Sequence, residues 1–364
     1  MDDRDKPPSE SITPGPSKTF PRADPPGPDE PRSILRGLAG RVRLSGPMLG
    51  LLVILGLFIL MLQVKGGREH FLSWPNIQGL MHRSAVPATV ALGMLLIMIS
   101  GGIDLSVGSV VALVTVVTMK VFRGLEEDAG VGAASLAAVA AGVAVAGLCG
   151  LCNGLAITRL RVTPFVATLG MLSMARGVAV WLAERTTLSF HGERPGWVTA
   201  IQTAKAETWL FAPGVWSAFV LAAVVALLLH FTVFGRHCYA VGSNEATARL
   251  CGIPVERTKV AVYILAGLLT GWAGVLRFAE SNIGNPGAGV GLELEVIAAV
   301  VIGGASLSGG QGTVTGTLLG VLILAVLDNG VSISGVTIEV KYILIGAIIV
   351  ANTALSQWQR RKSE

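Results

Sequence analysis

The chain has 364 residues, of which 52% are hydrophobic and only 14% are charged, and its mean hydropathy is +0.65. Soluble domains carry about 25% charged residues, so this composition excludes a soluble multidomain protein and indicates a polytopic membrane protein. A helix crosses the bilayer with about 20 residues, which leaves room for roughly eight to twelve spans. Glycine is abundant (46 residues) and aromatic residues are scarce (6%), as expected where helices pack closely through small residues.

The beginning of the chain has a different composition. Residues 1–31 contain roughly half of the 17 prolines, mixed with charged residues and serines, and such a segment cannot bury an apolar face. The first apolar run begins only at Met48, too late for a signal peptide. We therefore expect a disordered cytoplasmic tail over 1–45, a transmembrane domain over 46–356 and a basic cytoplasmic end over 357–364.

Apolar runs recur along the rest of the chain and predict about ten transmembrane helices. Several are shorter than a full span, and those beside Gly101 and Gly303 are the shortest, as expected of broken or re-entrant helices. The predicted fold is therefore an all-α polytopic membrane protein in which some helices are broken or re-entrant. The runs cover 48–64, 86–100, 107–119, 131–149, 165–183, 215–234, 261–275, 294–302, 314–327 and 343–354.

Lysine and arginine residues near the ends of these runs predict the orientation. With ten spans, Arg159, Arg161 and the cations of 236–259 share one side with both termini, and the positive-inside rule makes that side cytoplasmic. The rule is satisfied imperfectly, because some cations fall on the outer side: Lys65, Arg68, Lys120 and Arg123. The longest outer loop, 184–211, fits a periplasmic docking surface or a solvated connector with interfacial aromatic residues.

Two short segments resemble each other, and each follows an apolar run. Paired glycines permit non-helical dihedrals, and each segment offers candidate N-caps for a following helix: Asp104 or Ser106 in the first, Ser306 or Ser308 in the second. Each copy therefore predicts a helix, a break and a second helix, and the pair suggests an internal repeat. The copies read Gly101-Gly102-Ile103-Asp104-Leu105-Ser106-Val107-Gly108 and Gly303-Gly304-Ala305-Ser306-Leu307-Ser308-Gly309-Gly310.

Breaks of this kind place helix termini inside the membrane, where backbone groups can hydrogen-bond a polar solute. An uncompensated charge at Asp104 would cost at least about 2.5 kcal/mol there, which marks a functional position. Arg176 could pair with Asp104 or with backbone carbonyls, or could snorkel. The alternative is that the glycines serve close packing, that Asp104 only caps a helix and that the repeat is chance. The predicted translocation pathway comprises Gly101, Gly102, Asp104, Ser106, Gly303, Gly304, Ser306 and Ser308.

The polar loop over 235–254 contains a second candidate site. Asn244 is a suitable N-cap, Glu245 suits a first helical turn, Arg249 lies near the C-terminus, and Gly252 is a C-cap candidate. We therefore predict one short exposed helix between two spans. Such a helix can insert into a groove of a soluble partner, or it can be a solvated connector.

Four motifs in order make the chain resemble the permease subunits of ribose- and xylose-type ATP-binding-cassette importers, from about Gly46 onward. They are 101–109 (GGIDLSVGS), Asn153-Gly154 with 160–170 (LRVTPFVATLG), 242–253, and 297–310 (IAAVVIGGASLSGG). The resemblance implies a multi-pass permease of the cell inner (plasma) membrane that carries a monosaccharide such as ribose, xylose or galactose. It implies no catalytic site, no metal and no cofactor in this chain, because ATP is bound by a partner.

The resemblance also implies the partners. They are a cytoplasmic ATPase subunit, a periplasmic sugar-binding protein, a second permease subunit in a homodimer, and membrane lipid; no nucleic acid is expected. Carried over by motif, the ATPase coupling helix comprises Gly242, Asn244, Glu245, Ala248, Arg249 and Gly252, and Asp104 lies at the pathway.

Two departures from the family pattern, Leu292-Glu293-Leu294-Glu295 and Lys341, lie near the outer end of the expected pathway and leave the sugar open. The alternatives are a permease for another small polar solute and an ion-driven secondary transporter. A membrane enzyme is disfavoured because the five histidines are scattered.

Overall fold

The computed structural model describes residues 46–65, 68–192, 194–202 and 210–335, together with positions 343 and 346. The predicted tail, Lys341, most of the last apolar run and the basic end over 357–364 lie outside these residues. What the sequence predicts for them therefore stays a prediction.

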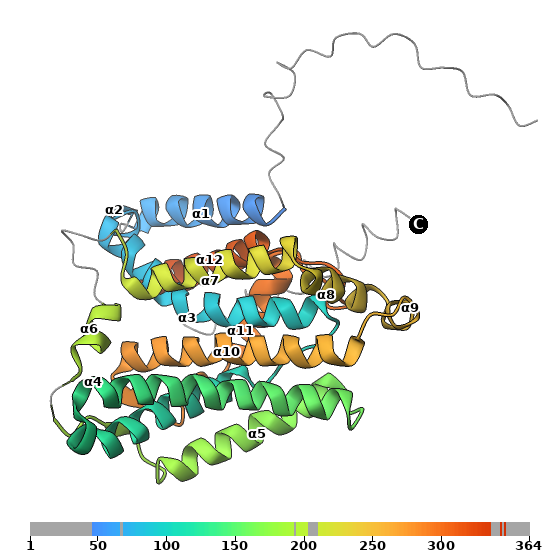
Figure 1. Ribbon diagram of the computed structural model, residues 1–364. Coiled ribbons are helices and arrows are strands. Elements are labelled where there is room, and N and C mark those ends of the chain that lie inside the picture. The colour runs from blue at the N-terminus through green and yellow to red at the C-terminus, as the bar shows by residue number, and fades with distance from the viewer. Residues whose placement is uncertain are drawn as a thin grey trace, which may run out of the picture. The chain divides into compact units, whose positions relative to one another are not determined.

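The described part of the chain is almost entirely helical (Figure 1). Two short strands, β1 (Leu188–Ser189) and β2 (Ile283–Gly284), pair antiparallel. The helices are α1 (Gly46–Lys65), α2 (Arg68–Phe71), α3 (Trp74–Ile99), α4 (Val107–Thr158), α5 (Pro164–Leu182), α6 (Gly196–Gln202), α7 (Pro213–Phe231), α8 (Val233–Ser243), α9 (Glu245–Leu250), α10 (Val255–Ser281), α11 (Leu292–Ile302) and α12 (Val314–Ile333).

Six of these helices, α3, α4, α5, α7, α10 and α12, are long and apolar enough to cross a membrane. Every predicted apolar run between residues 48 and 327 falls on a helix. The polytopic all-α fold is therefore confirmed.

Helix α4 contains two spans rather than one. Its 52 residues would extend about 78 Å, more than a bilayer requires. Gly130 interrupts it with a non-helical φ of 75° and ψ of 160°. A Cβ atom on Gly142 would lie 2.5 Å from Thr118 Oγ1, and these two positions are equally far from Gly130 in sequence. The halves, 107–129 and 131–158, therefore fold back on each other, as the separate apolar runs predict.

Helix α10 lies at the centre of the packing and contacts both α3 and α4 closely. A Cβ atom on Gly93 of α3 would lie 3.0 Å from the Cα of Ala266, and one on Gly271 would lie 2.9 Å from the Cα of Val143. Side chains of this interface, such as Tyr263, are almost fully buried. Small residues thus bring the backbones together, as expected in lipid, where there is no hydrophobic drive for helix association.

The two ends of α10 provide a depth reference, because its 27 residues extend about 40 Å. Helix α9 precedes its first residue and strand β2 follows its last, so we name these the α9 end and the β2 end. Arg159 lies at the α9 end, because nearby Gly154 packs on Val260. Lys120 lies at the β2 end, because neighbouring Met119 packs on Gly284 of β2, and it pairs with Glu184 at 3.1 Å. Arg159 and Lys120, which the sequence assigned to opposite sides, therefore lie at opposite ends.

The long segment after α5 is attached to the bundle by aromatic side chains. The ring of Phe190 lies 5.3 Å from that of Phe122 on α4 and 5.7 Å from that of Phe278 on α10. Trp197 of α6 stacks on Phe278 at 6.4 Å. Phe190 and Trp197 therefore attach this segment to the bundle, while most of its other described residues are exposed.

Candidate translocation site

The first predicted break lies where α3 ends. Gly101 has a φ of 82°, a left-handed conformation that favours glycine. Its N–H donates to the carbonyl of Met98 at 3.0 Å, and the N–H of Gly102 donates to that of Ile97 at 2.9 Å. These two bonds form a Schellman motif, which satisfies the last carbonyls of α3 and turns the chain away. The predicted helix, break and helix are confirmed here.

Asp104 builds the turn that starts α4. Its carboxylate is buried, and Oδ1 accepts from the N–H of Ser106 at 2.7 Å and from the hydroxyl of Ser106 at 2.6 Å. Asn153 donates to the same hydroxyl at 3.2 Å. Ser106 occupies the N-cap position of α4, but its side chain makes no cap bond. Asp104 therefore supplies the side-chain acceptor at this helix start, in an Asx turn.

Asp104 lies at mid-depth in the bundle. It shares a cavity of about 10 Å³ with Gly267 and Thr270, which occupy the middle of α10. This volume is close to that of one water molecule. Helix α4 therefore begins inside the part of the bundle that crosses the membrane, as the sequence predicts for a broken helix.

Arg176 does not pair with Asp104. Its Nη1 donates to the carbonyl oxygens of Pro286 at 2.6 Å and Ala288 at 2.9 Å. Of the three alternatives that the sequence left open, pairing with backbone carbonyls is confirmed. Arg176 thereby holds the loop that connects β2 to α11.

The second break ends α11 with the same motif. Gly304 has a φ of 92° and donates to Val301 at 2.9 Å, and Ala305 donates to Val300 at 3.1 Å. The structural counterpart of Gly101 is therefore Gly304, one residue later than the sequence repeat aligns them.

The predicted N-caps of the second copy are wrong. The N-cap of α12 is Thr313, whose Oγ1 accepts from the N–H of Gly316 at 3.1 Å. Ser306 instead accepts from the N–H of Ser308 at 3.2 Å and holds a turn within the loop. The physical reason lies in Gly309-Gly310, whose φ values of 87° and 71° prevent a helix from starting at the serines.

The N-terminus of α11 meets that of α4. A Cβ atom on Gly108 would overlap the carbonyl oxygen of Gly289 and would lie 2.5 Å from Glu293 Oε2. Glu293 and Glu295 stand in the first turn of α11, where the helix dipole favours negative charge. Two helix starts and their carboxylates therefore converge near mid-depth.

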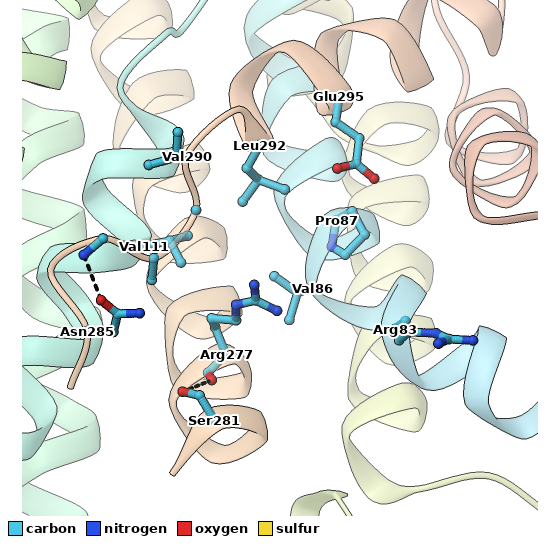
Figure 2. Close-up of a pocket in the computed structure, with 13 residues that line it drawn as sticks. Arg83, Val86, Pro87, Val111, Arg277, Ser281, Asn285, Val290, Leu292 and Glu295 are labelled. Atoms are coloured by element: carbon cyan, nitrogen blue, oxygen red, sulfur yellow. Dashed lines mark hydrogen bonds between the residues drawn. The ribbon is translucent and has the colours of Figure 1, made fainter. Parts of the chain in front are cut away.

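A cavity of about 380 Å³ lies between these helix starts and the β2 end (Figure 2). Its size falls within the range of about 300–1,000 Å³ typical of small-molecule sites. The sequence analysis did not predict this cavity. It singled out residues 292–295 as a departure from the family pattern, and Leu292 and Glu295 of that segment line the cavity. The lining residues are Arg83, Val86 and Pro87 of α3, Val111 of α4, Arg277 and Ser281 of α10, Asn285, Gly287, Ala288, Gly289 and Val290 of the following loop, and Leu292 and Glu295 of α11.

The polar groups of this cavity are held by neighbours. Arg277 pairs with Glu280 at 2.7 Å, and Arg83 donates to the side-chain oxygen of Asn329 at 3.0 Å. The N–H of Asn285 donates to Thr115 Oγ1 at 3.1 Å. The lining thus offers cationic donors and the carboxylate of Glu295 on opposing elements, which suits an uncharged solute that both donates and accepts hydrogen bonds.

The predicted short helix is confirmed as α9. Asn244 Oδ1 accepts from the N–H of Thr247 at 2.9 Å. At the other end Gly252, with a φ of 80°, donates to Arg249 at 3.1 Å, and Ile253 donates to Ala248 at 3.1 Å, which again forms a Schellman motif. Ala248 is buried beside Val241 and Val255. The residues before Asn244, which the sequence left as a loop, form α8.

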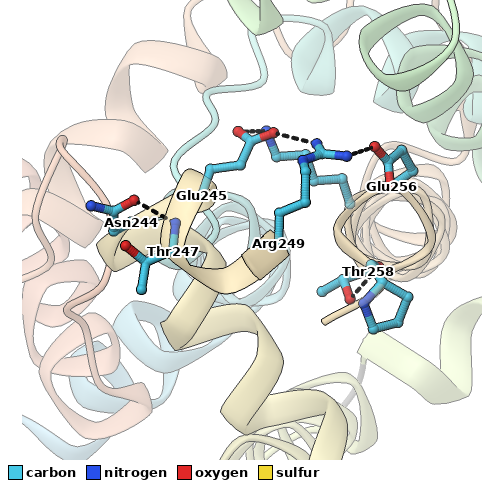
Figure 3. A network of polar contacts seen from close by, with 8 residues as sticks. Asn244, Glu245, Thr247, Arg249, Glu256 and Thr258 are labelled. Atoms are coloured by element: carbon cyan, nitrogen blue, oxygen red, sulfur yellow. Dashed lines mark hydrogen bonds and ion pairs between the residues drawn. The ribbon is translucent and has the colours of Figure 1, made fainter. Parts of the chain in front are cut away.

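A polar network connects α9 to the first turns of α10 (Figure 3). Glu245 pairs with Arg249 at 3.3 Å and with Lys259 at 2.6 Å, and Arg249 also pairs with Glu256. The hydrogen bond from Lys259, and then the charges of Lys259 and Arg249, hold the pKa of Glu245 below its ordinary value. Next to the network, Leu250 is 90% exposed. Helix α9 thus presents an ordered charged surface with one large apolar side chain, Leu250.

The chain is similar to known permeases over most of its length. Residues 76–353 match the family described as the branched-chain amino acid transport system / permease component. The ribose import permease protein RbsC of Bacillus subtilis (strain 168) is 37% identical over 325 residues, which cover 89% of this chain and 96% of that protein. The RbsC of Escherichia coli (strain K12) is 36% identical over 301 residues, 82% of this chain and 90% of the relative.

An L-arabinose ABC transporter permease protein, AraH of Azospirillum brasilense, is 34% identical over 292 residues, 80% of this chain and 83% of that protein. No solved structure gives a significant match. The resemblance found in the sequence motifs is confirmed, and the chain belongs to this family of membrane-embedded permeases.

Proposed function

We propose that the chain is the permease subunit of an ATP-driven importer in the inner (plasma) membrane and that its solute is a neutral monosaccharide. The carrying observation is the cavity of about 380 Å³, whose lining combines Arg277, Ser281, Asn285 and Glu295. A sugar ring presents hydroxyl groups that donate and accept, which matches donors and acceptors fixed on different helices. The named substrates of the relatives, ribose and L-arabinose, have this chemistry.

The proposed pathway runs from this cavity to the α9 end. It passes the converging starts of α4 and α11, where Asp104 and Ser106 lie, and continues past the two breaks. Support comes from the depth of Asp104 beside the middle of α10. Helix termini at that depth offer hydrogen bonds where lipid offers none. The residues proposed to border it remain Gly101, Gly102, Asp104, Ser106, Gly303, Gly304, Ser306 and Ser308.

Helix α9 is the proposed docking site of a cytoplasmic ATPase subunit, which binds and hydrolyses the ATP. The short helix is fixed at both ends by its cap and its Schellman motif, so a displacement of α9 also displaces its neighbours α8 and α10. Its exposed Leu250 and the charged pair Glu245 and Arg249 fit an amphipathic groove in a soluble partner. The α9 end is then cytoplasmic, and the β2 end faces a periplasmic sugar-binding protein. A second copy of the chain completes a homodimeric permease.

The test is the double variant Glu245→Ala, Arg249→Ala in proteoliposomes that contain the ATPase, with the binding protein and labelled pentoses supplied. We expect uptake per ATP hydrolysed to fall at least about tenfold, because the loss of two charged partners removes contacts worth about 1.5–3 kcal/mol each. The matched control is Arg159→Ala, which removes an exposed charge at the α9 end that belongs neither to α9 nor to its network.

Normal uptake with normal ATPase stimulation in the α9 double variant would contradict the docking role. Uptake that continues without ATP and stops with an ionophore would show a secondary transporter instead. Pentose-independent ATPase stimulation together with uptake of another solute would contradict the monosaccharide.

A further inference from the structure

The last turn of α8 touches both breaks directly through backbone atoms. A Cβ atom on Gly242 would overlap the carbonyl oxygen of Ile99 and would lie 2.6 Å from the nitrogen of Gly310. The N–H of Gly310 donates to that same carbonyl at 2.9 Å. Three backbone segments, from α8, from the end of α3 and from the loop before α12, therefore meet with no side chain between them.

Two further contacts hold these three backbone segments together. A Cβ atom on Gly309 would lie 2.7 Å from the carbonyl oxygen of Gly242 and 3.0 Å from the Cα of Gly101. One turn earlier on α8, the hydroxyl of Tyr239 donates to the carbonyl of Gly312 at 2.8 Å. We name the set Gly101, Gly242, Gly309 and Gly310 the glycine junction, and Tyr239 is its side-chain tether.

The glycine junction connects the site of the proposed motor to the walls of the cavity. Gly242 lies two residues before Asn244, the N-cap of α9, so α8 moves with α9. The same α3 that ends at the junction carries Val86 and Pro87, and α11, which runs into the junction loop, carries Leu292 and Glu295. Backbone atoms in van der Waals contact cannot approach further, so a displacement of α8 is passed on rather than absorbed.

We propose that the glycine junction transmits the movement of α9 to α3 and α11, and that Gly242 and Tyr239 are positioning residues for transport. This inference rests on the proposed docking of the ATPase at α9. It explains why two breaks far apart in sequence both end beside one turn of α8. Neither residue contacts the cavity, so their effect on solute passes through the two helices.

Two variants test the junction in the complete complex of permease, ATPase and binding protein. Tyr239→Phe keeps the ring and removes only the hydrogen bond to Gly312. Gly242→Ala places a methyl group against Ile99. The matched control is Gly177→Ala, because Gly177 lies in α5 with open space around its Cβ position.

The first readout is pentose uptake per ATP hydrolysed, with the basal ATPase rate measured separately. We expect Tyr239→Phe to lower uptake per ATP about threefold to tenfold, the effect of losing one hydrogen bond from the moving connection. Gly242→Ala should lower it further, and Gly177→Ala should leave it unchanged. The basal ATPase rate of Tyr239→Phe should stay within about twofold, because α9 and its network are untouched.

The second readout separates transmission from simple packing. Spin labels at Thr247 of α9 and Val290 of the cavity rim, both exposed, are placed in a variant without the four native cysteines. We expect the distance between them to change when a non-hydrolysable ATP analogue binds, and Tyr239→Phe to reduce that change at least about twofold.

The outcomes separate this inference from the proposed function. If the α9 double variant uncouples transport while Tyr239→Phe keeps normal uptake per ATP and the full distance change, the junction is overturned and the docking role stands. If the α9 double variant itself keeps normal uptake per ATP hydrolysed, the proposed docking role of α9 is contradicted. If Gly242→Ala does not fold, Tyr239→Phe alone decides.

Discussion

At the scale of single residues, Asp104 is the buried carboxylate on which the start of α4 depends. Its Oδ1 accepts two hydrogen bonds from Ser106, at 2.7 and 2.6 Å. Asp104→Asn keeps a side-chain oxygen for both, so we expect a loss of stability below about 1 kcal/mol, whereas Asp104→Ala should cost about 2–4 kcal/mol. Thermal unfolding in detergent measures the difference. Loss of uptake in Asp104→Asn at an unchanged melting temperature would show instead that the negative charge itself serves transport.

A substitution of Arg277 tests whether the cavity binds the solute. Its guanidinium lies in the lining and pairs with Glu280, which does not line the cavity. Arg277→Met keeps much of the apolar stem and removes the donors, so we expect the maximal rate of pentose uptake to fall at least about tenfold. The matched control, Glu280→Gln, breaks the same ion pair from outside. It should have little effect, because such partly exposed pairs contribute only about 0–1 kcal/mol. Equal losses in both variants would assign Arg277 to the ion pair rather than to the solute.

Sequence reasoning identified some of these residues and missed others for a physical reason. Asp104 and Arg176 stand out because an ionisable residue beside or within an apolar run is expensive. Arg83 and Arg277 do not stand out, because each lies near the polar end of a long helix, where cations are ordinary. Only the folded chain shows that they face one cavity.

At the scale of elements, the C-terminal turn of α9 depends on one glycine. Gly252 has a φ of 80°, and the space around its Cβ position is open, so Gly252→Ala strains the backbone without a clash. We expect it to destabilise α9 by about 1–2 kcal/mol and to raise hydrogen exchange at 245–252. Gly177→Ala, inside α5 and equally open, should be neutral or slightly stabilising. Unchanged exchange in Gly252→Ala would show that the tertiary contacts of Ala248 hold α9 without its cap.

The elements themselves were largely predictable, and the exceptions have a common cause. Apolar runs located the helices, and the pattern from Asn244 to Gly252 located α9, because cap chemistry is local. Helix α8 was missed because Gly235 and Gly242 lower helix propensity. The apolar run located α12, but its N-cap was misplaced, because Ser306 and Ser308 have the right chemistry for an N-cap, whereas Gly309-Gly310 set the path of the backbone.

At the scale of the whole molecule, the site is assembled around α10. The cavity takes residues from α3, α4, α10 and α11, and the glycine junction takes residues from α3, α8 and the loop before α12. No short sequence pattern contains either group, since each depends on which helices pack together. The internal repeat has a related explanation: both copies end a helix in a Schellman motif, and Gly101 of the first copy and Gly309-Gly310 of the second lie against one turn of α8.

The proposed orientation of the molecule in the membrane can be measured directly. Cys251, which is exposed, lies just before α10, and Thr187 immediately precedes β1, whose partner strand β2 follows α10. Because α10 is long enough to cross the bilayer, these two positions lie on opposite sides of it. With the α9 end in the cytoplasm, a membrane-impermeant maleimide should label Cys251, in a chain whose other three cysteines are replaced, only in inverted vesicles. Thr187→Cys, in a chain whose native cysteines are replaced, should be labelled only in intact spheroplasts. The reverse pattern would place α9 outside the cell, beyond the reach of ATP, and would exclude an ATPase docked there.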